Sequence, residues 1–174
     1  MIEVLVTVVI LTTGLLGLAG LQLRLQRAEM EAYQRTQALM LLEDMANRIA
    51  VNRNFAANYV TTAASPLGAG MTCPTTTATQ QQKDAGEWCN ALQGAAEKSG
   101  TSNVGTMVGG RGCVEDQGNN EYLLTVAWQG LGPVSAPPTS VACGKNDYDD
   151  ATGSACTNDL CRRAVTTIVR IAPL

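Results

Sequence analysis

The strongest pattern in the chain is an uninterrupted apolar run at its beginning. Glu3 and Arg24 enclose residues 4–23, in which no side chain ionises. Twenty helical residues span about 30 Å, which is the thickness of the hydrocarbon core of a bilayer. The run lacks the basic stretch before it and the small-residue cleavage site after it that are typical of a secretory signal peptide. The pattern therefore predicts a retained helix that can cross a membrane.

The helical pattern continues beyond the apolar run. Residues 21–53 contain neither Gly nor Pro and are rich in strong helix formers. We therefore expect one helix over residues 1–53, about 80 Å long at 1.5 Å per residue. Oppositely charged residues four positions apart stabilise such a helix and are expected on its solvated face. These pairs are Arg27 with Glu31, Glu31 with Arg35, and Asp44 with Arg48.

One face of the predicted helix is apolar in its second half and needs a packing partner. Its members recur at helical spacing: Ala38, Leu41, Leu42, Met45 and Ile49. The chain is therefore expected to have three parts, namely an apolar helix segment (1–25), an amphipathic continuation of the helix (26–53) and a globular head domain (54–174).

All six cysteines lie in the expected head domain, at Cys73, Cys89, Cys113, Cys143, Cys156 and Cys161. The even number, the loop-rich surroundings and the absence of a CxxC pair favour disulfides over a zinc site. Fifteen pairings are possible. Proximity and expected strand adjacency favour Cys73 with Cys89, Cys113 with Cys143, and Cys156 with Cys161.

The head domain has the pattern of an α+β domain. A Thr-, Ala- and Gly-rich surface loop is expected over residues 61–82. Asp84 and Glu87 resemble a capping box at the start of a helix that ends near Lys98. Alternating apolar positions predict strands at 121–128 and 164–172, with shorter ones near 104–108, 112–115 and 139–143. The apolar face of the long helix is expected to pack on the resulting antiparallel sheet.

Nothing in the sequence favours catalysis, a cofactor or a metal site. The chain has no histidine, and it lacks phosphate-binding glycine motifs. The acidic segment 145–159 lacks the ligand spacing of a calcium loop and is expected to be a solvated loop. A net charge of −3 gives no general attraction to nucleic acid. Arg162 and Arg163 form only a small basic spot, interpreted as the entry to a strand.

Glu3 is the residue that requires an explanation, because an unpaired carboxylate within a bilayer costs about 2.5–3.5 kcal/mol. One interpretation is that Glu3 lies close enough to the helix end to reach the polar interface. The other is that Glu3 neutralises a cation, such as an amino-terminal ammonium, on a neighbouring subunit.

The apolar helix and its continuation, IEVLVTVVIL and GLLGLAGLQLRLQRAEMEAYQRTQALMLLEDMANRI, resemble the amino-terminal helix of type IV pilins. Later segments make the chain similar to the PilV group of minor pilins, the type IV pilus modification proteins. These segments are GCV (112–114), LTVAWQGL (124–131), CG (143–144) and RRAVTTIVRIA (162–172). Residues 61–110 match least.

The resemblance implies a filament subunit whose apolar helix is bundled in the fibre and whose disulfide-bonded head faces outward. Glu3 falls on the family's acidic position, which is expected to pair with the amino terminus of an adjacent subunit and to set its axial register. Other minor pilins and the major pilin are the implied partners, and the bacterial inner membrane holds the subunit before assembly at the pilus tip.

The resemblance also implies processing and N-methylation by a prepilin peptidase, after a leader ending in Gly. The sequence given opens at Met1 without such a leader, so either it is a trimmed or mis-started form, which we favour, or processing differs here. Pilus-based twitching motility and cell adhesion are implied in the same way. Two other classes stay open: a pseudopilin of a type II secretion system, and a single-pass membrane protein with a periplasmic ligand-binding head, which predicts a pocket within residues 61–110.

Overall fold

The structure, a computed structural model, describes residues 2–95, 97–100, 102–103, 105, 107–150 and 153–172. A single helix, α1 (Ile2–Val51), opens the chain and is followed by a 3-10 helix, η1 (Arg53–Tyr59). The chain divides into two compact units, residues 1–33 and Gln34–Leu174, which are described separately. The long helix expected from the sequence is confirmed.

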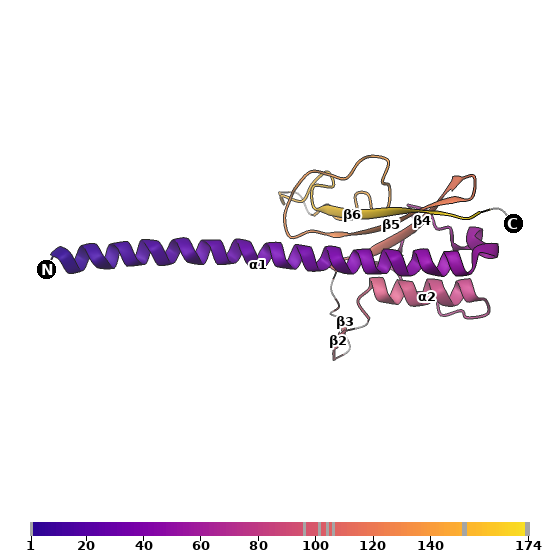
Figure 1. Cartoon of the computed structure of the whole chain (residues 1–174), viewed down its shortest axis with the longest axis horizontal. Helices are drawn as coiled ribbons and strands as arrows, with labels where there is room; N and C mark the ends of the chain where they lie inside the picture. The colour runs from indigo at the N-terminus through magenta and orange to yellow at the C-terminus, as the bar shows by residue number, and fades with distance from the viewer. Residues whose placement is uncertain are drawn as a thin grey trace. The chain divides into compact units, whose positions relative to one another are not determined.

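The second unit contains a four-stranded antiparallel sheet in the order β1-β4-β5-β6 (Figure 1). Its strands are β1 (Leu67–Gly68), β4 (Arg111–Gly118), β5 (Glu121–Gln129) and β6 (Arg162–Arg170). Asn119 and Asn120 form the two-residue turn between β4 and β5, with positive φ values of 52° and 60°. Such a turn favours Asn and matches the twist of the strands. A small hairpin, β2 (Lys98–Ser99) and β3 (Ser102–Asn103), lies outside this sheet.

Residues 34–51 of α1 and the helix α2 (Gln80–Leu92) pack on one face of the sheet. The apolar face expected from the sequence is confirmed, because Ala38, Leu42, Met45 and Ile49 are buried and Leu41 packs against them. The strands contribute alternate residues to the same core, among them Val114, Leu124 and Val126. The α+β class, with a long N-terminal helix, a C-terminal antiparallel sheet and disulfides, is thus confirmed.

Trp88 of α2 fixes the contact between this helix and the sheet. A Cβ atom at Gly112 would lie 2.2 Å from Cη2 of the Trp88 ring, so the indole occupies the space that a side chain would need. The Trp88 Nε1–H donates to the carbonyl of Leu41 at 2.9 Å, which connects α2 to α1. The buried indole of Trp88 therefore packs its apolar ring against the sheet and has a hydrogen-bond partner for its N–H.

The sequence placed the boundaries of α2 wrongly. The helix begins at Gln80 because Thr79 is its N-cap, whose hydroxyl accepts from the Gln82 N–H at 3.2 Å. Asp84 is therefore not a capping residue but lies buried within the helix. The helix ends at Leu92, not near Lys98, because Gly94 has a φ of 73° and lies in close contact with Gly105.

The strands at 121–128 and 164–172 are confirmed as β5 and β6, and 112–115 lies within β4. The loop expected over 61–82 is wrong in part, because this segment contains β1 and the start of α2. Residues 139–143 form a turn that is fixed by a disulfide, not a strand. Within 104–108, Gly105, Met107 and Val108 are not in a strand, and the other two positions lie outside the described residues.

Candidate assembly surface

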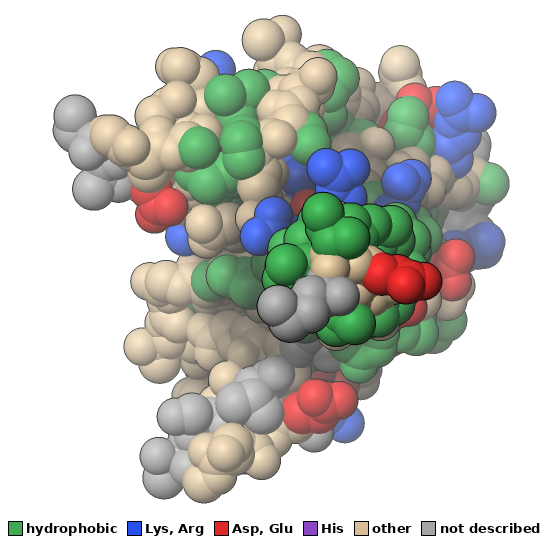
Figure 2. Space-filling model, turned by 90° about the vertical axis from the view of Figure 1, so that its left-hand side faces the viewer, with side chains coloured by type: hydrophobic (Ala, Val, Ile, Leu, Met, Phe, Trp, Pro, Cys, Tyr) green, Lys and Arg blue, Asp and Glu red, His purple; other side chains and the backbone are tan. Residues whose placement is uncertain are grey.

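In the first unit, residues 4–23 of α1 present a helix surface that is almost entirely apolar. Its large hydrophobic side chains are exposed all around the helix, from Ile2 (80% exposed) through Leu16 (73%) to Leu25 (54%). Figure 2 looks onto the N-terminal end of α1 and shows hydrophobic side chains surrounding it. By length and composition this is a helix that can cross a membrane. A soluble protein rarely exposes so large an apolar patch, so the surface requires lipid or other protein around it.

The threonines of this segment do not interrupt its apolar character. The hydroxyl of Thr7 donates to the carbonyl of Val4 at 2.9 Å, and that of Thr12 donates to Val9 at 3.0 Å. Thr13 donates in the same way to the carbonyls of Val9 and Ile10. Because each hydroxyl is bonded within the helix, it needs no partner from outside.

Glu3 is the only ionisable residue in the described part of the chain before Arg24. It lies in the first turn of α1 and is exposed. The positive end of the helix dipole favours a carboxylate at this position. Its expected role in subunit register stays a prediction, as do the segment boundaries at residues 25 and 53.

A network around Arg48 joins α1 to α2 and was missed in the sequence, where Arg48 was interpreted only as the partner of Asp44. The Arg48 Nη1 donates to Asp84 at 2.9 Å and to Glu87 at 2.7 Å, while its Nε donates to Asp44 at 2.9 Å. Burial alone lowers the pKa of Arg48, but its bonds to the three carboxylates outweigh this effect and raise the pKa above its ordinary value. Arg48 therefore stays charged.

Asp84 is the buried centre of this network, with 2% of its side chain exposed. Besides Arg48, it accepts hydrogen bonds from the Tyr59 hydroxyl and from Gln80 Nε2 at 2.8 Å. Tyr59 in turn accepts from Asn52 Nδ2 at 2.9 Å. The network thus also fixes η1, and the periodicity of the sequence gives no sign of it because Asp84 lies 36 residues from Arg48.

The Tyr59→Phe variant is expected to flatten the loss of stability at alkaline pH. Burial and the bond to Asp84 raise the pKa of Tyr59 to about 12, compared with about 10 in an unfolded chain. The folded protein therefore retains this proton while the unfolded chain loses it, and stability falls as the pH rises from about 10 to about 12. Thermal unfolding of both proteins at pH 8 and pH 11 checks this, and an equal decline in both would contradict it.

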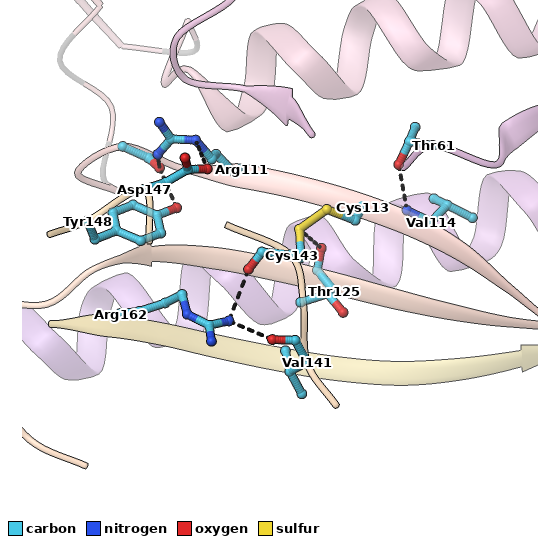
Figure 3. The surroundings of a disulfide bond; sticks show 11 residues. Thr61, Arg111, Cys113, Val114, Thr125, Val141, Cys143, Asp147, Tyr148 and Arg162 are labelled. Carbon is cyan, nitrogen blue, oxygen red and sulfur yellow. Dashed lines mark hydrogen bonds and ion pairs between the residues drawn. A yellow bond between two sulfur atoms is a disulfide. The ribbon is translucent and has the colours of Figure 1, made fainter. Parts of the chain in front are cut away.

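The six cysteines form three disulfides: Cys73–Cys89, Cys113–Cys143 and Cys156–Cys161, with Cα atoms 5.6, 5.9 and 5.2 Å apart. These are the pairs favoured by proximity in the sequence. Figure 3 shows how Cys113 of β4 holds the turn at Cys143 against the sheet face opposite the helices. The disulfide thereby attaches the long connection between β5 and β6 to β4.

Arg162 and Arg163 begin β6, which confirms their interpretation as the entry to a strand, but they form no basic spot because the side chain of Arg162 is buried at 1% exposed. Its guanidinium donates to the carbonyls of Val141 and Cys143 at 2.8 and 3.1 Å, as Figure 3 shows, and pairs with Asp159 at 3.1 Å. Asp159 also accepts from the Asn146 N–H at 2.7 Å. Arg162 therefore supports the turn next to the Cys113–Cys143 disulfide.

The described part of the acidic segment 145–159 is a largely exposed loop, as expected, but some of its side chains contact the rest of the head. Asp147 pairs with Arg111 at 3.1 Å, and the Arg111 guanidinium lies 4.9 Å from the centre of the Tyr148 ring. The Tyr148 hydroxyl donates to the carbonyl of Gly109 at 2.8 Å, and burial raises its pKa to about 12. Among the residues that the structure describes, no group of three or more potential metal ligands occurs. Asp147, Asp149 and Asp159 thus have hydrogen-bond or ion-pair partners within the head.

The head also contains a hollow of about 280 Å³ next to η1. Residues 79–81 at the start of α2 line it together with Asn52, Phe55 and Asn58. These are amide, hydroxyl and aromatic side chains without a charged or nucleophilic group, so the hollow offers no evident chemistry.

A family model described as Tt1218-like, type IV pilin Tt1218, matches residues 20–99 of the chain. The match includes part of the apolar segment, the remainder of α1, and the elements η1, β1 and α2. It supports a type IV pilin, and with it a structural role, but it does not separate the PilV group from other pilins. No curated protein and no solved structure matches the chain.

Proposed function

We propose that this chain is a minor pilin of the type IV pilus, of the PilV group, which helps to prime assembly and is incorporated at or near the pilus tip. The observation that carries the proposal is the exposed apolar surface of residues 4–23, preceded by the carboxylate of Glu3 in the first helical turn. Lipid covers this surface in the stored subunit, and the helices of neighbouring subunits cover it in the fibre.

Within this proposal, the inner membrane anchors the subunit with its head in the periplasm, where the three disulfides can form. Other minor pilins and the major pilin are its partners, and a prepilin peptidase processes and methylates it. The role is structural and involves neither a cofactor nor nucleic acid.

In this scheme Glu3 pairs with the amino terminus of an adjacent subunit. A charge pair in an apolar bundle mainly specifies register, because a misaligned subunit leaves a buried charge without a partner. The family match supports a type IV pilin, and the apolar helix provides a surface for packing between subunits. The pairing of Glu3 with a neighbouring amino terminus is our proposal.

The Glu3→Gln variant tests the proposal. It retains the size of the side chain and removes its charge, so it leaves the neighbour's cation unpaired at a cost of about 3 kcal/mol. Incorporation into sheared filaments is expected to fall about 100-fold, while the amount in the inner membrane stays unchanged. Glu29→Gln is the matched control, since Glu29 lies on the same helix beyond the apolar run.

Immunoblots of sheared filaments and of membranes measure both pools, and wild-type incorporation of Glu3→Gln would overturn the proposed pairing. Deletion of the gene is expected to reduce surface pili and twitching. If the deletion strain has intact pili but does not export folded enzymes, the protein is a type II secretion pseudopilin. If the wild-type protein is absent from filaments, a single-pass membrane protein with a ligand-binding head is favoured.

A further inference from the structure

The free edge of the sheet is the feature that the fold does not use. Among the strands that the structure describes, β6 is the last of the sheet and pairs with β5 alone. The Ile171 N–H donates to the carbonyl of Asn120 at 2.9 Å, and the Gly130 N–H donates to that of Cys161 at 2.8 Å. Because hydrogen-bonded pairs alternate in an antiparallel ladder, odd-numbered residues of β6 bond to β5. The backbone groups of Ala164, Thr166, Ile168 and Arg170 therefore point outward.

Between Arg163 and Arg170, this edge lacks the charged and proline residues that commonly protect an edge strand. Residues 164–169 read AVTTIV, with five consecutive β-branched residues and neither Pro nor Lys. Thr166 is exposed and the side chain of Ile168 is 51% exposed. Within the described ranges of the chain, no backbone group bonds to the outward N–H groups at 164, 166, 168 and 170. A long edge of this kind is a template for another strand.

The opposite edge of the same sheet is closed. β1 has only two residues, and the carbonyl of Gly68 accepts from Gln93 Nε2 at 2.8 Å. The next stretch, on β4, is covered by Thr61, whose N–H donates to the Val114 carbonyl at 2.8 Å and whose hydroxyl accepts from the Val114 N–H at 2.9 Å. A second copy of this chain therefore cannot extend the sheet by bringing this edge to β6.

Two β6 strands are also poorly suited to each other. β6 runs in the same direction as residues 34–51 of α1 (Figure 1), and Ile171, directly after β6, lines the same hollow as Arg53. If two β6 strands paired antiparallel, the helices of the two subunits would point in opposite directions. Subunits in one membrane must have their helices pointing in the same direction, which excludes this pairing. A parallel, in-register pair would place Arg163 and Arg170 beside their own copies, which is repulsive.

We propose that the β6 edge binds an antiparallel edge strand from the head domain of a different subunit in the same assembly. This inference rests on the proposed function. The donor strand runs antiparallel to the helix of its own subunit, as β5 does here. The helices of the two subunits can then point in the same direction. Opposite Thr166 and Ile168 it carries neutral β-branched or aromatic residues, because these pair best with such side chains. Main-chain bonds supply affinity and the side chains supply specificity.

The experiment uses the full-length protein in pilus-forming cells, with a photo-crosslinking amino acid at position 168. A probe at Met71, which is 38% exposed and follows the closed β1 edge, is the positional control. The expected product joins residue 168 to a strand in the head of a different protein that has its own pilin-type helix. Mass spectrometry of the crosslinked peptides identifies that strand.

Thr166→Pro in the same protein removes one outward N–H without breaking the β5–β6 ladder, since proline is tolerated where an edge N–H faces away from the sheet. It is expected to lower the crosslinking yield about tenfold or more. Thr166→Val is the matched control, because it retains the N–H and the branched shape. If Thr166→Pro lowers the melting temperature, Ile168→Lys with the probe at position 166 replaces it and is expected to give the same loss.

Crosslinks to a second copy of this chain, or none while the protein is in filaments, would overturn the inference. An undiminished yield in a folded Thr166→Pro or Ile168→Lys variant would do the same. These failures leave filament incorporation intact, whereas failure of the proposed function removes the protein from filaments altogether.

Discussion

The Arg48→Met variant is expected to lower the free energy of unfolding of the Gln34–Leu174 unit by about 3 kcal/mol. Removing the guanidinium leaves Asp84 buried, with only Tyr59 and Gln80 as hydrogen-bond partners. It also disconnects the helices that Arg48 joins through Asp84 and Glu87. Methionine retains most of the apolar stem, so lost packing contributes little.

Urea unfolding of the detergent-solubilised protein, followed by tryptophan fluorescence, measures this loss because Trp88 and Trp128 are both buried in this unit. Arg53→Met is the control, since Arg53 is exposed at the start of η1. Adding Asp84→Asn to Arg48→Met is expected to recover part of the loss, because it removes the unpaired charge. A loss equal to that of the control would show that the network contributes little.

The Cys113→Ala/Cys143→Ala double variant is expected to cost about 3–4 kcal/mol. This disulfide closes a loop of 30 residues, whereas Cys156–Cys161 closes one of 5. Loop-closure entropy grows with loop length, so the matching double variant at Cys156 and Cys161 is expected to cost about 2 kcal/mol. The first variant also frees the turn whose carbonyls bind Arg162.

Urea midpoints of the two double variants, measured under non-reducing conditions, provide the comparison. Equal losses, or a larger loss for the short loop, would contradict the chain-entropy account. If cells degrade both variants, their half-lives after synthesis provide the comparison, and the Cys113→Ala/Cys143→Ala variant is expected to have the shorter one.

Periodicity was sufficient for the long elements of the fold. The apolar face from Ala38 to Ile49 and the alternation in β5 and β6 each reflect burial on one side, which repeats regularly along the chain. The start of α2 was misplaced because two capping signals competed. Thr79 caps the helix, and Asp84, which resembles a cap in sequence, is used instead by Arg48 and Tyr59.

The candidate assembly surface was visible in the sequence because lipid and helix bundles require a continuous apolar run. The Arg48 network, the burial of Arg162 and the open β6 edge were not visible. Each depends on which segments meet in space, such as Arg48 with Asp84 across 36 positions. Whether a strand lies at the edge of a sheet depends on the order of the strands. The residue pattern within β6 does not reveal that order.

The boundary between Tyr33 and Gln34 has a practical consequence for biochemists who want to handle the head without detergent. All large apolar side chains that are exposed before Tyr33 would be removed by truncation there, while Ala38, Leu42, Met45 and Ile49 keep their packing. A fragment that begins at Gln34 is therefore expected to remain in solution without detergent, which suits it to crystallisation and to binding measurements in plain buffer.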